Sequence, residues 1–286
     1  MTKYLGIIGG SGLYEMEGLE NIGTETVSTP FGDPSDSIIT GSLDGMKMAF
    51  LPRHGKGHRI TPSEINYRAN IWALKSLGVD TVISISAVGS MKEEIVPGDL
   101  VVPHQFIDRT KGRASTFFGG GIVGHVTFAD PVCHSLAGVV AKGAGTTGAK
   151  VHQGGTYICM EGPQFSTRAE SNLYRTWGVD VIGMTNIPEA KLAREAELCY
   201  STLALATDYD CWHESEDDVS VEAILQIMHH NVENAKTAIA WVARNLAEKK
   251  ACSCSEALKF AIVTDPSVIP DKVKKDLGPI IGKYVK

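Results

Sequence analysis

The sequence has no long run of apolar residues and no cluster of Lys and Arg side chains. No stretch approaches the roughly 18 apolar residues that a membrane-spanning helix needs, and the first ten residues lack the small-residue cleavage site of a secretory signal. The net charge of −6 argues against a nucleic acid or an anionic membrane as the main partner. We therefore expect a cytoplasmic protein without a nucleic-acid or membrane partner.

Cysteine is scarce as well, and its spacing matches no paired zinc motif. The six cysteines are Cys133, Cys159, Cys199, Cys211, Cys252 and Cys254. Only Cys252 and Cys254 are close in the sequence, and they are either two ordinary reduced thiols or a redox couple that closes a strained disulfide. No cysteine has a histidine at a convincing spacing, so we expect neither a metal site nor a catalytic thiol.

The chain does contain a regular alternation of strand-like and helix-like segments. The expected strands include Tyr4–Ile8, Lys47–Pro52, Thr81–Ser86, Leu100–Pro103, Val151–Cys159, Val181–Gly183 and Tyr200–Ala206. The expected helices include Pro62–Leu77, Pro131–Ala144 and Val221–Lys249. This alternation predicts an α/β fold with a mostly parallel β-sheet flanked by helices on both faces. No linker or repeat divides the sequence, so we expect a single domain over residues 1–286.

Two carboxylates, Asp208 and Asp210, directly follow the apolar run Tyr200–Ala206. In an open α/β sheet, ligands bind at the C-terminal ends of the strands. Residues at i and i+2 of an extended backbone point to the same side, so both carboxylates are expected to face one site. Taken alone, however, an Asp-x-Asp pair more often marks a solvated loop.

Three other strand ends carry groups suited to an anion. The first expected strand leads into Gly9–Gly12, a turn whose backbone N–H groups and Ser11 hydroxyl can surround a phosphate. The second leads into Arg53–His58, where arginine offers a bidentate fork and glycines allow close backbone approach. The third ends at Ser86 in small residues. The GxGxxG spacing is absent, so a phosphate-sized ligand fits better than a dinucleotide.

Several longer motifs carry a resemblance to a known family. They are GIIGGSGL, RHGKGH followed by INYRANIWALK, MEGPQFSTRAES, GMTNIPEAKLAREAE and ATDYDCW. In this order and spacing the sequence resembles the 5′-methylthioadenosine phosphorylases of the nucleoside phosphorylase superfamily. The resemblance implies a central mixed sheet, a trimer or dimer of trimers, and phosphorolysis of methylthioadenosine to adenine and 5-methylthioribose 1-phosphate. It implies no cofactor, because inorganic phosphate is the co-substrate.

The resemblance also implies the residues of a phosphate site. Carried over by position, these are Ser11, Arg53, His54, Ser86, Ala87 and Thr185. A dianion needs several fixed donors, and one guanidinium with hydroxyls and backbone amides supplies them. The resemblance further implies that subunits meet near the active site, and we expect the Gly-rich region Phe117–Gly124 to be involved.

A second set of residues is implied for the nucleoside. These are Asp208, Asp210, Phe165, Ser166, Met184, His58 and Val221. An ionised carboxylate only accepts hydrogen bonds, so it suits the 6-amino group of adenine and disfavours a 6-oxo group. The related 6-oxopurine phosphorylases have Asn in the acidic loop and Glu in place of Ser166, and this sequence follows the aminopurine pattern. Val221, with His58 nearby, is expected to border the 5′-methylthio group.

The expected reaction is direct displacement at C1′ through an oxocarbenium-like transition state, without a covalent intermediate. We assign to Asp208 the proton that the N7 atom of the leaving adenine must receive, which requires a raised pKa, and to Asp210 the 6-amino group. Glu161 is either structural or ribose-orienting. The acidic stretch 214–218 is either a lid over the base or a solvated loop.

Two alternatives stay open. One is a purine nucleoside or methylthioinosine phosphorylase of the same fold. The other is a non-catalytic nucleotide-binding protein, in which the phosphate loops persist without turnover. Phosphate-dependent release of adenine from methylthioadenosine distinguishes a methylthioadenosine phosphorylase from both alternatives.

Overall fold

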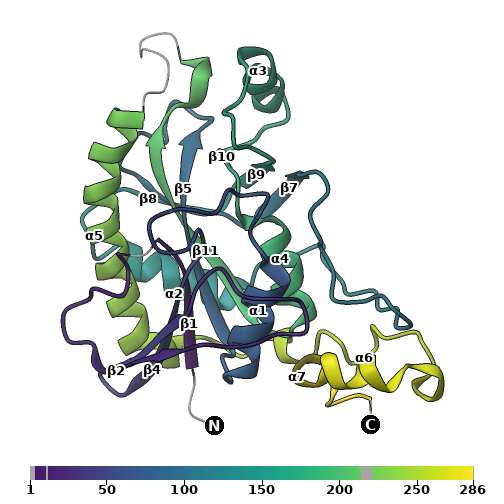
Figure 1. Cartoon of the computed structure of the whole chain (residues 1–286). Coiled ribbons are helices and arrows are strands. Elements are labelled where there is room, and N and C mark those ends of the chain that lie inside the picture. Colours follow the sequence, from purple (N-terminus) through teal and green to yellow (C-terminus); the bar gives the residue numbers. More distant parts are fainter. Residues whose placement is uncertain (1–3, 11, 214–220, 286) are drawn as a thin grey trace.

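The computed structural model describes residues 4–10, 12–213 and 221–285, and the side chains of residues 221–226 are also outside the description. Figure 1 shows a central β-sheet with helices against both faces. The strands are β1 (Tyr4–Gly9), β2 (Glu20–Glu25), β3 (Ile38–Leu43), β4 (Met46–Pro52), β5 (Thr81–Ser90), β6 (Leu100–Val102), β7 (Gln105–Arg109), β8 (Val151–Gln153), β9 (Thr156–Met160), β10 (Val181–Gly183) and β11 (Cys199–Asp208). The helices are α1 (Tyr67–Ser76), α2 (His134–Ala144), α3 (Arg168–Thr176), α4 (Asn186–Glu195), α5 (Val221–Asn245), α6 (Asp271–Asp276) and α7 (Gly278–Ile281).

Strand β5 lies at the centre of the sheet and organises it. Its first residues pair in parallel with β1, its whole length pairs in parallel with β11, and its last residues pair antiparallel with β10. Strands β9 and β7 continue the sheet beyond β10, while β4, β3 and β2 continue it beyond β1. The sheet therefore divides at the C-terminal half of β5, where strands with different neighbours leave a crevice suited to a ligand.

Two hydrophobic layers cover opposite faces of the sheet. One face packs against α1, α4 and the C-terminal helix α7, and the other packs against α2 and α5. Alternation along β5 supplies both layers, because Val82 joins the first and Ile83 and Ile85 join the second. The predicted α/β class, with a mixed and mostly parallel sheet, is confirmed among the described residues.

Several predicted elements have different ends in the structure: β5 continues to Ser90, α2 begins at His134 and α5 ends at Asn245. Two further differences have a clear local cause. The first helix begins at Tyr67 rather than Pro62, because the Asn66 side chain caps it by accepting a hydrogen bond from the Ala69 amide at 3.2 Å. The expected strand Val151–Cys159 is two strands, since Gly154 and Gly155 adopt φ values of 107° and 88° that an extended strand excludes. Both errors arise from local backbone geometry within correctly located segments.

A single eleven-stranded sheet runs through the described residues. This continuity supports the expectation of one domain over residues 1–286, which stays a prediction. Within the described part of the chain, no helix combines the length and the apolar character that a membrane crossing demands. The acidic stretch 214–218, predicted as a lid or a solvated loop, lies outside the described residues.

Candidate active site

A cavity of about 550 Å³ opens at the C-terminal ends of β1, β4, β5 and β11. Its volume is in the range that small-molecule ligands occupy. The predicted site residues that line it are Arg53, His54, His58, Ser86, Ala87, Phe165, Met184, Thr185, Asp208 and Asp210. Three predicted residues are not among the lining residues: Ser166 is set back from the wall, Ser11 is outside the described residues, and so is the Val221 side chain.

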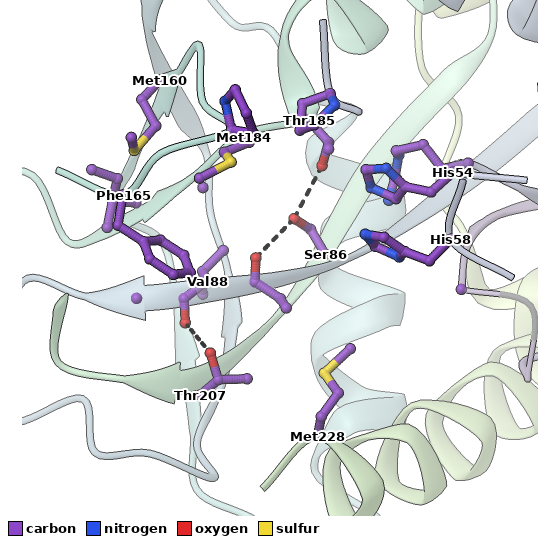
Figure 2. Close-up of a pocket in the computed structure, with 18 of the residues that line it drawn as sticks. His54, His58, Ser86, Val88, Met160, Phe165, Met184, Thr185, Thr207 and Met228 are labelled. Carbon is purple, nitrogen blue, oxygen red and sulfur yellow. Dashed lines mark hydrogen bonds between the residues drawn. The ribbon is translucent and has the colours of Figure 1, made fainter. Parts of the chain in front are cut away.

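Ser86 and Thr185 form a polar centre in this cavity. Ser86 comes from β5 and Thr185 follows β10, and their hydroxyl oxygens lie 3.3 Å apart. The Ser86 hydroxyl is also 3.1 Å from the Tyr157 hydroxyl. Figure 2 shows Ser86 between the two histidines on one side and the apolar side chains on the other. Thr185 precedes α4 without making a side-chain capping bond, so its hydroxyl remains directed at Ser86 and the cavity.

His54 contributes a neutral imidazole beside this centre. Its Nδ1 atom lies 2.8 Å from the Ile60 carbonyl oxygen, which can only accept, so Nδ1 carries the proton and Nε2 is an acceptor. Burial, together with the positive charge of Arg53, lowers the pKa of His54 to about 4. The ring stacks on His58 with 4.3 Å between centroids. His54 is therefore suited to accept a hydrogen bond from a protonated phosphate oxygen.

Arg53 lines the cavity, but most of its N–H groups donate to the protein. Its Nε and Nη2 atoms form a bidentate ion pair with Glu189 at 2.8 and 3.1 Å, and both side chains are buried. The guanidinium also donates to the Ile85 carbonyl at 2.8 Å and to the Ser84 hydroxyl at 2.6 Å. Burial lowers the pKa of Arg53, but the Glu189 carboxylate outweighs this effect and the net shift is upward. Glu189 takes up the bidentate fork of Arg53, and the expected contact of Arg53 with phosphate stays a prediction.

Glu189 is a residue that sequence reasoning missed. Besides Arg53, it accepts a hydrogen bond from the Tyr200 hydroxyl at 2.9 Å. It lies on α4, and Tyr200 lies on β11. One buried carboxylate therefore joins the end of β4 to α4 and β11. The acidic residue in NIPEA was visible, but nothing in its spacing connects it to an arginine 136 positions earlier.

Asp208 and Asp210 lie side by side, but not on an extended backbone as predicted. Asp208 ends β11 beyond a register shift at Ala206, whereas Asp210 has φ of 53° and begins a 3₁₀ turn. The turn brings them together, because the Asp210 amide donates to Asp208 Oδ1 at 2.8 Å. The Thr207 hydroxyl donates to the other oxygen of Asp208 at 2.7 Å. A bulge next to a ligand site is a common way to redirect such side chains.

The two carboxyl groups have different surroundings. Asp210 is 8% exposed, whereas Asp208 is only partly buried. Burial, with the neighbouring charge of Asp208, raises the pKa of Asp210 to about 6. The Asp208 carboxyl group accepts hydrogen bonds from the Thr207 hydroxyl and from the Asp210 amide. Asp210 therefore holds its proton to a higher pH than an ordinary aspartic acid does.

Apolar side chains form the opposite wall of the cavity. Phe165, Met160 and Met184 gather there in Figure 2. Phe165 is 52% exposed, so its ring is available to a flat ligand. Ser166 lies next to this wall, with its hydroxyl 3.6 Å from the Met160 sulfur. An aromatic face and two thioethers beside two carboxylates suit a planar, hydrogen-bonding base.

Met228 is a second residue that sequence reasoning missed. It lines the cavity from α5, and Figure 2 shows it projecting from that helix towards Ser86. It follows Val221 by seven residues, a spacing that returns to the same face of a helix. The helical period of the predicted segment could therefore have indicated it.

Glu161 and Arg113 form a network behind the cavity. The Glu161 carboxylate accepts hydrogen bonds from Ser63, from the Lys111 amide and from Arg113 Nε. Arg113 also donates to the carbonyl oxygens of Met184 at 2.7 Å and Ile187 at 2.9 Å. This arrangement favours the structural interpretation of Glu161, since its oxygens fasten Arg113 to the loop that carries Met184.

Comparisons with known proteins agree on one family. Residues 4–244 match the family described as the phosphorylase superfamily. The chain is 62% identical over 286 residues to the S-methyl-5′-thioadenosine phosphorylase of Geobacter sulfurreducens, covering 100% of both chains. A methylthioadenosine phosphorylase from an Antarctic soil metagenomic library has a similar crystal structure, with a TM-score of 0.93 and 48% identity over 98% of this chain and 99% of that chain. A Schistosoma mansoni methylthioadenosine phosphorylase in complex with adenine gives a TM-score of 0.83 and 37% identity over 90% of this chain and 96% of that chain.

Proposed function

The chain belongs to the phosphorylase superfamily, and within it we propose that the protein cleaves 5′-methylthioadenosine with phosphate to adenine and 5-methylthioribose 1-phosphate. It is a methylthioadenosine phosphorylase, since relatives of that name match its full length. The observation that carries this function is the carboxylate pair Asp208 and Asp210, which shares one cavity with the hydroxyls of Ser86 and Thr185. Carboxylates for an aminopurine and hydroxyls for an anion are the two halves that the reaction requires.

Phosphate binds at the Ser86 and Thr185 end of the cavity in this proposal. The two hydroxyls donate to phosphate oxygens, and His54 Nε2 accepts a hydrogen bond from the remaining P–OH group. Ala87 and Ser11 add backbone and hydroxyl donors, as the family resemblance implies. Arg53 also lines this end of the cavity, and its ion pair with Glu189 holds the end of β4, from which His54 projects.

Adenine binds between Phe165 and the carboxylate pair. Negative charge develops on the leaving base, so N7 must receive a proton in the transition state. We assign this proton to Asp210, whose pKa is raised to about 6 by burial. Asp208 then accepts a hydrogen bond from the 6-amino group. This assignment reverses the roles expected from the sequence and follows from the difference in burial.

The 5′-methylthio group lies against α5 in this proposal. Met228 supplies an apolar wall there, together with Val221 and with His58 as the resemblance implies. An apolar pocket gains about 1–3 kcal/mol per extra group and rejects a hydroxyl poorly. Adenosine is therefore a slower second substrate. Displacement at C1′ proceeds directly, without a covalent intermediate and without a cofactor.

The protein assembles as a trimer or a dimer of trimers in this proposal. The predicted contact region Phe117–Gly124 packs on the chain's own C-terminal segment, where the Val263 amide donates to the Val123 carbonyl at 3.0 Å. Val123, Val263 and Phe260 are all exposed in the single chain. Apolar side chains gathered at one surface support a subunit contact there. A cytoplasmic location stays a prediction from the sequence.

Steady-state rates with four nucleosides test the function. The substrates are methylthioadenosine, adenosine, inosine and methylthioinosine, each with and without phosphate. We expect phosphate-dependent release of adenine, fastest from methylthioadenosine and slower from adenosine. Efficient release of hypoxanthine would support a 6-oxopurine phosphorylase instead, and binding without any turnover would support a non-catalytic protein.

A further inference from the structure

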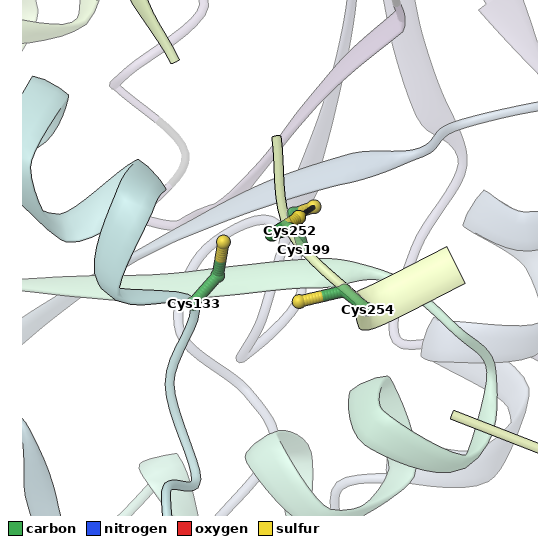
Figure 3. Close-up of side chains that lie close together, drawn as sticks. All are labelled: Cys133, Cys199, Cys252 and Cys254. Carbon is green, nitrogen blue, oxygen red and sulfur yellow. Dashed lines mark hydrogen bonds between the residues drawn. The ribbon is translucent and has the colours of Figure 1, made fainter. Parts of the chain in front are cut away.

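A second cluster of reactive side chains lies at the other end of the sheet. The Sγ atoms of Cys133, Cys199, Cys252 and Cys254 all lie within 4.8 Å of one another. Figure 3 shows the four side chains gathered in one small region. Cys199 begins β11 and Asp208 ends it, so at about 3.3 Å per residue the cluster is about 30 Å from the carboxylate pair. The proposed reaction makes no use of these thiols.

We propose that the four cysteines, as thiolates, bind one zinc ion. Zinc prefers four tetrahedral sulfur ligands at about 2.3 Å, which sets neighbouring sulfur atoms about 3.8 Å apart. The observed limit of 4.8 Å, and the 3.4 Å between the Cys199 and Cys252 sulfur atoms, bracket that spacing. An iron–sulfur cluster needs thiolates that stand farther apart, so a single metal ion fits the cluster better.

The ligands come from three separate parts of the fold. Cys133 occupies the N-cap of α2, a position where the helix dipole stabilises a thiolate. Cys199 is the first residue of β11, and Cys252 and Cys254 follow α5. Cys133, Cys199 and Cys254 are buried, so their positions are set by the packing around them. Such a preformed set of ligands is what a structural metal site requires.

Charge and access also suit a metal. Zinc and four thiolates carry a net charge of −2, and the Lys249 ammonium lies 3.2 Å from the Cys252 sulfur. A second cavity of about 330 Å³ is lined by Cys133, Cys252 and Cys254, which provides a route from solvent to the cluster. On binding, each thiol loses its proton to solvent while zinc keeps its oxidation state, so no oxidant or reductant is needed.

A bound zinc ion would link the segment after α5 to the start of α2 and the start of β11. The sequence contains no Cys-x-x-Cys pair among these four residues. For this reason no metal site was predicted from the sequence. Two disulfides could use the same four sulfur atoms, and they are the competing state of this cluster. The structure describes all six cysteines as free thiols.

Metal analysis of the full-length protein tests the proposal. Protein is produced with zinc in the medium and purified with a thiol reductant and no chelator, and zinc is measured by mass spectrometry. We expect close to one zinc per chain, and cobalt(II) substitution should give the visible d–d bands of a tetrahedral thiolate site. The double variant Cys252→Ser/Cys254→Ser should lose both signals. The control Cys211→Ser, which removes a thiol outside the cluster, should keep them.

A thiol count on the wild-type protein tests the zinc site without any variant. Thiols are counted under denaturing conditions after the reductant is removed, with and without a chelator. Six reactive thiols in the chelated sample, together with stoichiometric zinc beforehand, support the site. Protein that contains almost no zinc overturns it, whether six thiols react or fewer react because disulfides have formed.

Discussion

Asp208 and Asp210 are the same residue type two positions apart, yet their surroundings differ. The bulge at the end of β11 and the turn at Asp210 bury one carboxyl group and leave the other partly exposed. A carboxyl group with a raised pKa can act as an acid, while its ionised neighbour accepts hydrogen bonds. The chemical difference between them is therefore created by the local backbone.

Asp210→Asn should lower kcat with methylthioadenosine by about 100-fold or more, because it removes the acid that protonates N7. In the wild type, kcat/KM at saturating phosphate should fall as pH rises through about 6, where Asp210 loses its proton. Asp208→Asn should weaken adenine binding but still show the decrease of kcat/KM with rising pH. If this decrease is lost in Asp208→Asn and kept in Asp210→Asn, then Asp208 is the acid for N7, as expected from the sequence.

The same pKa has a consequence for stability. Because the pKa of Asp210 is raised from 3.8 to about 6, the folded state binds this proton more tightly than the unfolded chain. The resulting stabilisation is present below pH 3.8 and is lost as pH rises through about 6. The free energy of unfolding of Asp210→Asn, measured relative to the wild type, should accordingly increase across that interval.

Gly89 allows the carboxylate pair to lie close to β5. A Cβ atom at this position would be 2.9 Å from Asp208 Oδ1 and 3.1 Å from an Ile182 side-chain carbon. Gly89→Ala should therefore displace Asp208 and lower kcat/KM for methylthioadenosine by at least about 10-fold, at a cost of about 1–3 kcal/mol of overpacking. Gly138→Ala is the matched control, since open space surrounds that position in α2. Unchanged kinetics in Gly89→Ala would contradict the proposed packing.

At the level of elements, β4, α4 and β11 meet through the buried pair Arg53 and Glu189. Removing one partner of such a pair leaves an uncompensated charge in the interior. Glu189→Gln should lower the free energy of unfolding by about 3–5 kcal/mol in a denaturant titration. Glu233→Gln breaks the exposed pair with Lys236 and should change it by no more than about 1 kcal/mol. Equal changes in the free energy of unfolding in the two variants would show that the buried pair contributes no more to stability than the exposed one.

Helix α5 lines the cavity with Met228, which is proposed to contact the methylthio group. Met228→Gln keeps the length of the side chain but places an amide against the methylthio group. The ratio of kcat/KM for methylthioadenosine to that for adenosine should fall by about 10-fold or more, as expected for 1–3 kcal/mol of lost apolar contact. The rate with adenosine serves as the internal control. A ratio equal to that of the wild type would place the methylthio group elsewhere.

On the scale of the whole molecule, the apolar surface near the C-terminal segment is the proposed subunit contact. Phe260 is 90% exposed in the single chain, which is unusual for a large aromatic side chain. Phe260→Ser should shift the protein to a smaller species in light scattering after size-exclusion chromatography. Ile22→Ser, at an exposed apolar position on β2, should leave the assembly unchanged. A trimer or hexamer that persists in Phe260→Ser would locate the subunit contact on another face.

Short sequence patterns were enough to predict most strands and most residues of the candidate site. The strand ends predicted at Ile8, Pro52 and Ala206 lie within about two residues of the observed ends, because short apolar runs stop where polar residues and glycines begin. The ends of helices and strands were predicted less accurately where one or two residues decide them. Examples are Asn66, which caps α1, and the glycine pair between β8 and β9. Most of the predicted site residues line one cavity because the C-terminal ends of parallel strands meet at one edge of a sheet.

The sequence by itself determined the fold class, the strand ends that meet at the cavity and the pair Asp208 and Asp210, because each depends on residues close together in the chain. The tertiary structure alone decided which partners those residues have. It joined Arg53 to Glu189 and brought four cysteines from three elements together. It also buried Asp210 more deeply than Asp208, which raised its pKa. Burial and long-range pairing arise from packing, and packing is not encoded in the spacing of any one motif.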